Sequence, residues 1–97
     1  MESINKILQQ IISIAIEYQA DQVILFGSRA RGDAEEKSDI DVAILAPNLH
    51  QRAWLDLVAK TTEIETLLSI DVVRLDQAGE KLKERVKQEG KLLYEHN

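Results

Sequence analysis

The stretch VILFGSRARGDAEEKSDIDVAIL, residues 23–45, decides the fold. An apolar run, 23–26, leads into Gly27-Ser28, and a second apolar run, 42–45, follows Asp39-Ile40-Asp41. Short apolar runs bounded by turn residues are typical of strands. The pattern therefore predicts a strand, a Gly-Ser turn, a polar loop, a pair of carboxylates and a second strand.

The two aspartates are spaced so that they can act together. A strand alternates its side chains between two faces, so Asp39 and Asp41 should point the same way, with their Cα atoms about 7 Å apart. Proteins hold Mg²⁺ through one or two carboxylates together with substrate phosphates. Residues 27–41 carry three cationic and five acidic side chains, a net charge of −2. An anionic triphosphate would be repelled there unless metal came with it, so the pattern favours metal-dependent binding.

The Gly-Ser turn is the candidate phosphate-binding element. Gly27 permits unusual dihedral angles and a close approach to the backbone. Ser28 can open a helical turn whose free N–H groups face a phosphate. Arg29 is the third candidate for phosphate binding, because a guanidinium group suits that ligand. Arg29 and Arg31 could instead pair with nearby carboxylates and brace the loop, and the sequence leaves both interpretations open.

A third carboxylate follows later in the chain. Residues 69–75 predict a third strand with Asp71 near its beginning. Asp is depleted in strands, so its presence needs a reason. If this strand lies beside the second one, Asp71 completes a cluster with Asp39 and Asp41. The first two would hold metal, and Asp71 would bind a second metal ion or accept the proton of an attacking hydroxyl. The alternative is a structural aspartate that caps a turn.

These motifs resemble the signature of the nucleotidyltransferase superfamily related to DNA polymerase beta. Gly27-Ser28 is followed by ten residues, then Asp39-x-Asp41 and a later strand with Asp71. The resemblance covers the length and element order of the whole chain. It is strongest to the minimal nucleotidyltransferase (MNT) proteins, the antitoxin partners of HEPN toxins.

The resemblance implies a Mg²⁺-dependent enzyme, with two ions, that transfers AMP from ATP to a hydroxyl of a partner protein. It assigns catalysis and metal binding to Asp39, Asp41 and Asp71, and implies a HEPN toxin as the partner. Two alternatives stay open: transfer to a small molecule or an RNA end, and a non-catalytic antitoxin that neutralises its partner by contact alone.

The composition sets wider bounds. The chain has 97 residues, enough for a single domain spanning 1–97, and 44% of them are hydrophobic. A net charge of −5 argues against extensive nucleic-acid binding. No apolar run approaches the length of a membrane span, no basic segment precedes an apolar block at the N-terminus, and there are no cysteines. We therefore expect a cytoplasmic protein. We also expect it to work in a complex, with itself or a HEPN chain, because few residues remain to build an acceptor site.

Alternating helical and strand patterns predict an α/β (α+β) fold with a small mixed sheet of three to four strands and helices packed on it. The resemblance implies that this is the nucleotidyltransferase fold, like the polymerase beta palm. The first helix should have Ser3 as its N-cap. The last helix should be capped by Asp76 and end at Gly90. The predicted helical segments are 4–19, 28–32, 50–68 and the one after Asp76; the predicted strands are 22–26, 39–46, 70–75 and a short edge strand at 91–94.

Overall fold

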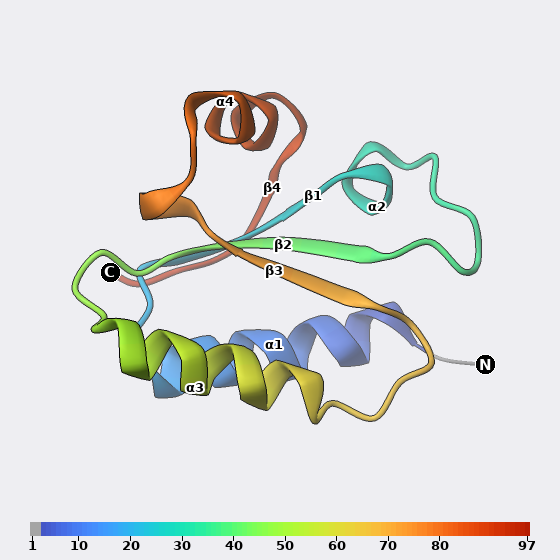
Figure 1. The fold of residues 1–97 in the computed structure, drawn as a ribbon. Coiled ribbons are helices and arrows are strands. Elements are labelled where there is room, and N and C mark those ends of the chain that lie inside the picture. The colour runs from blue at the N-terminus through green and yellow to red at the C-terminus, as the bar shows by residue number, and fades with distance from the viewer. Residues whose placement is uncertain (1–2) are drawn as a thin grey trace.

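A computed structural model describes residues 3–97. Four strands form one mixed sheet in the order β3-β2-β1-β4, with helices on both of its faces (Figure 1). This confirms the predicted fold class. The elements are α1 (Ile4–Glu17), β1 (Gln22–Phe26), α2 (Ser28–Arg31), β2 (Ile40–Leu45), α3 (Gln51–Thr62), β3 (Ile70–Arg74), the 3₁₀ helix η1 (Leu75–Gln77), α4 (Glu80–Glu89) and β4 (Lys91–Glu95).

The pairing of the strands determines which side chains become neighbours. β1 lies antiparallel to both β2 and β4, whereas β2 lies parallel to β3. In the parallel ladder Asp41 is the register partner of Asp71. In the antiparallel ladder Asp41 lies opposite Phe26, the last residue of β1. The third predicted strand therefore does lie beside the second one.

The core has two unequal parts. α1 and α3 cover one face of the sheet and α4 covers the other (Figure 1). The larger buried cluster takes most of its helical side chains from α1 and α3, with Ala30 added from α2. Helix α1 buries residues at the 3.6-residue spacing seen in the sequence. The smaller cluster consists of Phe26, Ala43 and Val86. A single apolar residue of α4, Val86, is thus fully buried against the sheet.

Helix α1 starts as the sequence predicts. The Ser3 hydroxyl accepts a hydrogen bond from the Lys6 amide at 3.4 Å, which confirms the N-cap. The helix ends at Glu17, two residues earlier than predicted, and Gln19 has a positive φ of 60°. No helix among residues 3–97 is long and apolar enough to cross a membrane.

Helix α3 is shorter than predicted: it ends at Thr62, and residues 63–69 form turns, bends and irregular backbone. The hydroxyls of Thr61 and Thr62 donate to the carbonyls of Val58 and Ala59, both at 2.6 Å. Consecutive β-branched residues also favour helix poorly, and such back-bonding competes with the regular pattern. The prediction of a helix through residue 68 was wrong for this reason.

The predicted cap of the last helix was also wrong. Asp76 lies in η1, where it accepts hydrogen bonds from the Ala46 amide and from Arg74 Nε, both at 3.0 Å. The helix begins later, after Gly79. It ends at Gly90, as predicted, but in an extended conformation (φ −70°) and not in a left-handed one. Glycine is needed there because a Cβ would overlap the Val86 carbonyl oxygen. The edge strand that follows is confirmed as β4.

Candidate active site

Gly27 joins β1 to the short helix α2 and holds an unusual backbone conformation, with φ 77° and ψ −161°. That region of backbone space is accessible essentially to glycine alone. A Cβ at this position would overlap Asp41 Oδ2 and lie 3.1 Å from Asp41 Cγ. The predicted unusual dihedral is therefore confirmed for Gly27. The group that the structure places against its backbone is the Asp41 carboxylate, and the approach of a phosphate stays a prediction.

Helix α2 orients the backbone that follows. The carbonyl of Gly27 accepts hydrogen bonds from the Ala30 and Arg31 amides at 3.1 and 3.0 Å. The amides of Ser28 and Arg29 have no acceptor within residues 3–97. Free first-turn N–H groups of this kind are suited to an anion. Phosphate binding by Gly27, Ser28 and Arg29 stays a prediction.

The predicted carboxylates gather where β1, β2 and β3 meet. Asp39 directly precedes β2 and is exposed, Asp41 is half-buried and Asp71 is exposed. None of the three forms a salt bridge with any residue in 3–97. Burial raises the pKa of Asp41, and the nearby charges of Asp71, Asp39 and Glu89 raise it further, against an opposing effect of Arg85. A cation would relieve this accumulation of negative charge.

The donor set fits a hard cation such as Mg²⁺, which prefers carboxylate oxygens. Asp41 and Asp71 lie on adjacent strands, whose backbones are about 4.8 Å apart. Their side chains can therefore turn toward a shared ion. Even so, no three His, Cys, Asp or Glu side chains of residues 3–97 stand close enough together to form a ready-made metal cluster. The assignment of Asp39, Asp41 and Asp71 as metal ligands stays a prediction.

Both arginines of the Gly-Ser segment make contacts that brace the loop. Arg29 donates to the Ser38 carbonyl from Nε at 3.2 Å and from Nη2 at 2.8 Å, and to the Glu36 carbonyl at 3.0 Å. Arg31 pairs with Asp33 at 3.2 Å. These contacts match the bracing interpretation that the sequence had left open.

Two residues of α4 belong to the site, and the sequence interpretation missed both. Glu89 accepts hydrogen bonds from the Gly27 amide at 3.2 Å, from Arg31 Nη1 at 3.0 Å and from Arg85 Nε at 3.2 Å. The Arg85 guanidinium lies over the Phe26 ring, 5.3 Å from its centroid. The charges of α4 alternate in sign along the sequence, a pattern that is typical of a solvated face and gives no indication of a partner. The one sequence signal that extends to this helix is the family resemblance, which covers the element order of the whole chain.

The Glu89 carboxylate is held in its charged form. Partial burial would raise its pKa, but the Gly27 amide, Arg31 and Arg85 together lower it below the usual range. Two cations and one backbone amide thus converge on this single carboxylate. It connects the last turn of α4 to the Gly-Ser turn.

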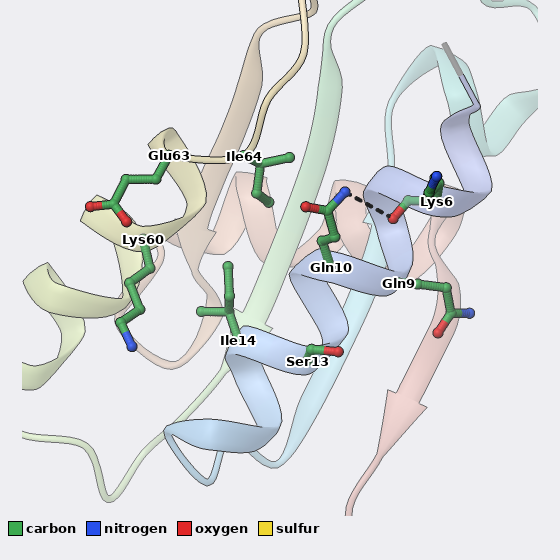
Figure 2. Close-up of a pocket in the computed structure, with 8 residues that line it drawn as sticks. All are labelled: Lys6, Gln9, Gln10, Ser13, Ile14, Lys60, Glu63 and Ile64. Carbon is green, nitrogen blue, oxygen red and sulfur yellow. Dashed lines mark hydrogen bonds between the residues drawn. The ribbon is translucent and has the colours of Figure 1, made fainter.

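The larger surface pockets lie away from these groups. A cavity of about 560 Å³ opens between α1 and α3, on the opposite face of the sheet from α4 (Figure 2). In it Gln10 turns back to donate to the Lys6 carbonyl at 3.4 Å. A second cavity of about 550 Å³ lies beside α4, lined by Ile24, Leu45 and Leu92 among others. None of the three aspartates lines either cavity, so neither one defines the candidate active site.

Comparison with known proteins places the chain among related sequences and structures. The family described as "Polymerase beta, Nucleotidyltransferase" matches residues 9–97. A protein of Methanocaldococcus jannaschii, named "Putative protein adenylyltransferase", is 35% identical over 86 residues, which cover 87% of this chain and 90% of that protein.

The solved structures that resemble this one include toxin–antitoxin complexes. One holds a tri-AMPylated Shewanella oneidensis HEPN toxin in complex with MNT antitoxin; the matched chain is 26% identical, with a TM-score of 0.71 and coverage of 95% of this chain and 72% of that one. Another is a toxin-antitoxin with AMP-PNP, at 28% identity, a TM-score of 0.71 and coverage of 92% and 73%. In each of these pairs the similarity covers most of both chains.

Proposed function

The chain belongs to the polymerase beta nucleotidyltransferase family, and from this premise we propose that it transfers the adenylyl group of ATP to a hydroxyl of a partner protein. The observation that carries the proposal is the position of the Asp41 carboxylate. It lies against the Gly27 backbone and beside Asp71 in the parallel ladder. A triphosphate held on the turn would therefore lie close to the carboxylates that hold its cation.

The relatives support a protein as the acceptor. The Methanocaldococcus jannaschii relative is named "Putative protein adenylyltransferase", and the Shewanella oneidensis complex contains a tri-AMPylated HEPN toxin. We propose a HEPN-type toxin as the partner of this chain and neutralisation of that toxin as the result. The acceptor hydroxyl would come from the partner, so the complex assembles a site that this short chain does not complete alone.

Each candidate site residue has a separate role in this proposal. Asp39 and Asp41 would hold the nucleotide-bound Mg²⁺, and the backbone amides of Ser28 and Arg29 would bind the phosphates. Asp71 would act on the acceptor side, where it would take the hydroxyl proton or hold a second ion. Bound Mg²⁺ supplies charge neutralisation for the phosphates and for the leaving group.

The bond changes balance without any further reactant. The acceptor oxygen attacks the α-phosphorus of ATP, a new P–O bond forms, and the bond to the β-phosphate oxygen breaks. Pyrophosphate leaves with the bonding electrons, and the hydroxyl proton passes to Asp71 or to solvent. The carboxylates and the turn would hold the attacking and leaving oxygens in position, which is the main task of a phosphoryl- or nucleotidyl-transfer site.

A label-transfer assay tests the proposal. The chain is incubated with Mg²⁺, ATP labelled at the α-phosphate and the product of the neighbouring gene. We expect the label to appear on that protein, and none to appear when the label is at the γ-phosphate. Asp41→Asn should give no transfer in either case. Label that appears on added RNA and not on protein would contradict the protein acceptor, and no transfer to any acceptor would contradict the activity.

A further inference from the structure

We infer that Glu89 is a positioning residue of the nucleotide site, which fixes the Gly27–Ser28 turn and the guanidinium groups around it from the last turn of α4. The inference rests on the proposed function for its consequence, nucleotide binding. Its structural part concerns the turn alone and can be tested without any nucleotide.

The contacts of Glu89 reach two separate elements. One oxygen, Oε2, accepts from the Gly27 amide and from Arg85 Nε, each at 3.2 Å. The other, Oε1, accepts from Arg31 Nη1 at 3.0 Å. A single carboxylate therefore ties the backbone before α2, a side chain at the end of α2 and a neighbour on α4. Hydrogen bonds to a charged group are about twice as strong as neutral ones.

The turn needs such an anchor because of its conformation. Gly27 has the freest backbone of any residue type, and its φ of 77° is one state among many that glycine can adopt. Its amide donor is the group that Glu89 holds. Loss of that bond would leave the turn free to sample other conformations, with the Ser28 and Arg29 amides no longer aimed in one direction.

Glu89 differs from an ordinary surface salt bridge in two respects. Its side chain is only 21% exposed, whereas the other acidic partner of Arg31, Asp33, is 61% exposed. It also bonds to a backbone amide at the candidate site, which a surface pair between two flexible side chains does not do. Surface pairs contribute little to stability or to geometry, but this contact constrains the main chain.

Arg85 extends the same arrangement toward the carboxylates. The Arg85 guanidinium lies over Phe26, which is the register partner of Asp41. The positive charge of Arg85 lowers the pKa of Asp41, against the other effects that raise it. By bonding Arg85, Glu89 keeps this cation at the edge of the aspartate cluster. Arg85 pairs with Glu89, and no salt bridge of Asp41 occurs within residues 3–97.

The experiment compares Glu89→Ala and Glu89→Gln with a matched control on the same helix, Glu84→Ala. Glu84 is exposed and accepts a hydrogen bond from Gln88 of the same helix at 3.1 Å, so its side-chain contact stays within α4. Amide hydrogen exchange of Gly27 is measured by NMR on the free protein. Affinity for AMP-PNP with Mg²⁺ is measured by calorimetry, and Tm is recorded for each variant.

We expect Gly27 to exchange faster in Glu89→Ala and AMP-PNP affinity to fall roughly tenfold, the equivalent of one charge-assisted hydrogen bond. Glu89→Gln keeps an acceptor oxygen and should recover part of both effects, while Glu84→Ala should match the wild type. If Glu89→Ala does not fold, Gly27 exchange and AMP-PNP affinity are compared between Glu89→Gln and the wild type, and the same direction of change is expected.

Gly27 exchange that is unchanged in both Glu89 variants would overturn the inference, whatever happens to affinity. An affinity that rises on loss of Glu89 would overturn it too, because Glu89 would then compete with the phosphate. If the wild type does not bind AMP-PNP but Gly27 exchange still depends on Glu89, the proposed function fails and the positioning of the turn stands.

Discussion

At the scale of single residues, the glycine at position 27 allows the Asp41 carboxylate to lie against the backbone. Gly27 combines a backbone conformation that other residues avoid with a contact that leaves no room for a Cβ. Gly32, at the end of α2, also has a positive φ, of 88°, but has nothing within 4 Å of an added Cβ. Both positions would strain a larger residue, but only Gly27 adds the close contact with Asp41.

We expect Gly27→Ala to cost more stability than Gly32→Ala and to be the only one of the two that impairs nucleotide binding. Backbone strain alone should cost about 1–2 kcal/mol at Gly32, which is left-handed, and about 1–3 kcal/mol at Gly27, whose conformation is essentially restricted to glycine. At Gly27 the new methyl group would also displace Asp41. Urea unfolding and titration with AMP-PNP and Mg²⁺ measure the two effects. Equal losses of stability and binding in the two variants would show that the contact with Asp41 is unimportant.

Asp41 offers a second test, because its charge is unfavourable in the folded protein. Its raised pKa means that ionised Asp41 reduces folding stability, a cost that appears as the pH rises through the folded-state pKa. Asp41→Asn should therefore abolish adenylyl transfer and leave the resistance to urea at pH 7 equal to or above that of the wild type.

Asp56→Asn is the matched control, since Asp56 is an exposed residue of α3 on the far side of the sheet. It should retain both transfer and stability. Near-normal transfer by Asp41→Asn would refute the catalytic assignment. A large loss of stability would show that Asp41 is a structural residue.

At the scale of elements, the end of β3 is fixed by a buried ion pair. Arg74 and Asp76 lie 3.0 Å apart with side chains 6% and 13% exposed. Arg74 also donates to the Ala46 and Leu49 carbonyls and lies over the Trp54 ring. Asp76 accepts from the Ala46 amide at 3.0 Å. The pair thus connects β3 and η1 to the end of β2 and the start of α3, and so holds the parallel pairing on which Asp71 depends.

Asp76→Asn should destabilise the protein by about 3 kcal/mol at pH 7, because it leaves the buried Arg74 charge without its partner. Burial alone would raise the pKa of Asp76, but the Ala46 amide and Arg74 outweigh it and lower that pKa. The stabilisation is present above the ordinary aspartate pKa and is lost as the pH falls through the folded-state value. The difference between variant and wild type should therefore shrink in acid.

Urea unfolding at several pH values measures this, with Asp33→Asn as the control for an exposed pair. Asp33 bonds Arg31 with both side chains well exposed, so its loss should cost less than about 1 kcal/mol. A pH-independent difference for Asp76→Asn would show that its hydrogen bonds matter and its charge does not.

At the scale of the whole molecule, the sheet assembles groups that are distant in the chain. The turn follows β1, the aspartate pair lies at the start of β2, and the third aspartate lies in β3. Helix α4 lies on the face of the sheet opposite α1 and α3, and its last turn contacts the Gly-Ser turn (Figure 1). Asp71 is placed only by the parallel pairing of β2 with β3. Its proposed role on the acceptor side differs from that of the aspartate pair, and kinetics can separate the two.

Asp71→Asn should lower kcat strongly and reduce AMP-PNP affinity much less than Asp39→Asn does. An interaction made mainly in the transition state gives this pattern. Affinity, turnover and binding to the HEPN-type partner are measured on one preparation, and partner binding should persist. Unchanged turnover would make Asp71 a structural residue. A loss of affinity equal to that of Asp39→Asn would make it a ligand of the nucleotide-bound ion.

The sequence alone determined the turn, the aspartate pair and the strands that flank them, because these features are local. Apolar runs bounded by turn residues identified β1 and β2, and the glycine before Ser28 indicated an unusual backbone. The edge strand β4 was found in the same way. These local patterns indicated metal-dependent phosphate binding, and the resemblance to a known family added the expected reaction, nucleotidyl transfer.

The tertiary structure alone decided which residues from distant segments meet. Local periodicity does not state that β3 pairs in parallel with β2, that Asp76 bonds Arg74 and Ala46, or that Glu89 reaches the Gly27 amide. The sequence around a charged helical residue is the same whether its side chain faces water or contacts another element. The position of α4 over the sheet settled this for Glu89, since packing, and not propensity, determines which of its charged side chains finds a partner.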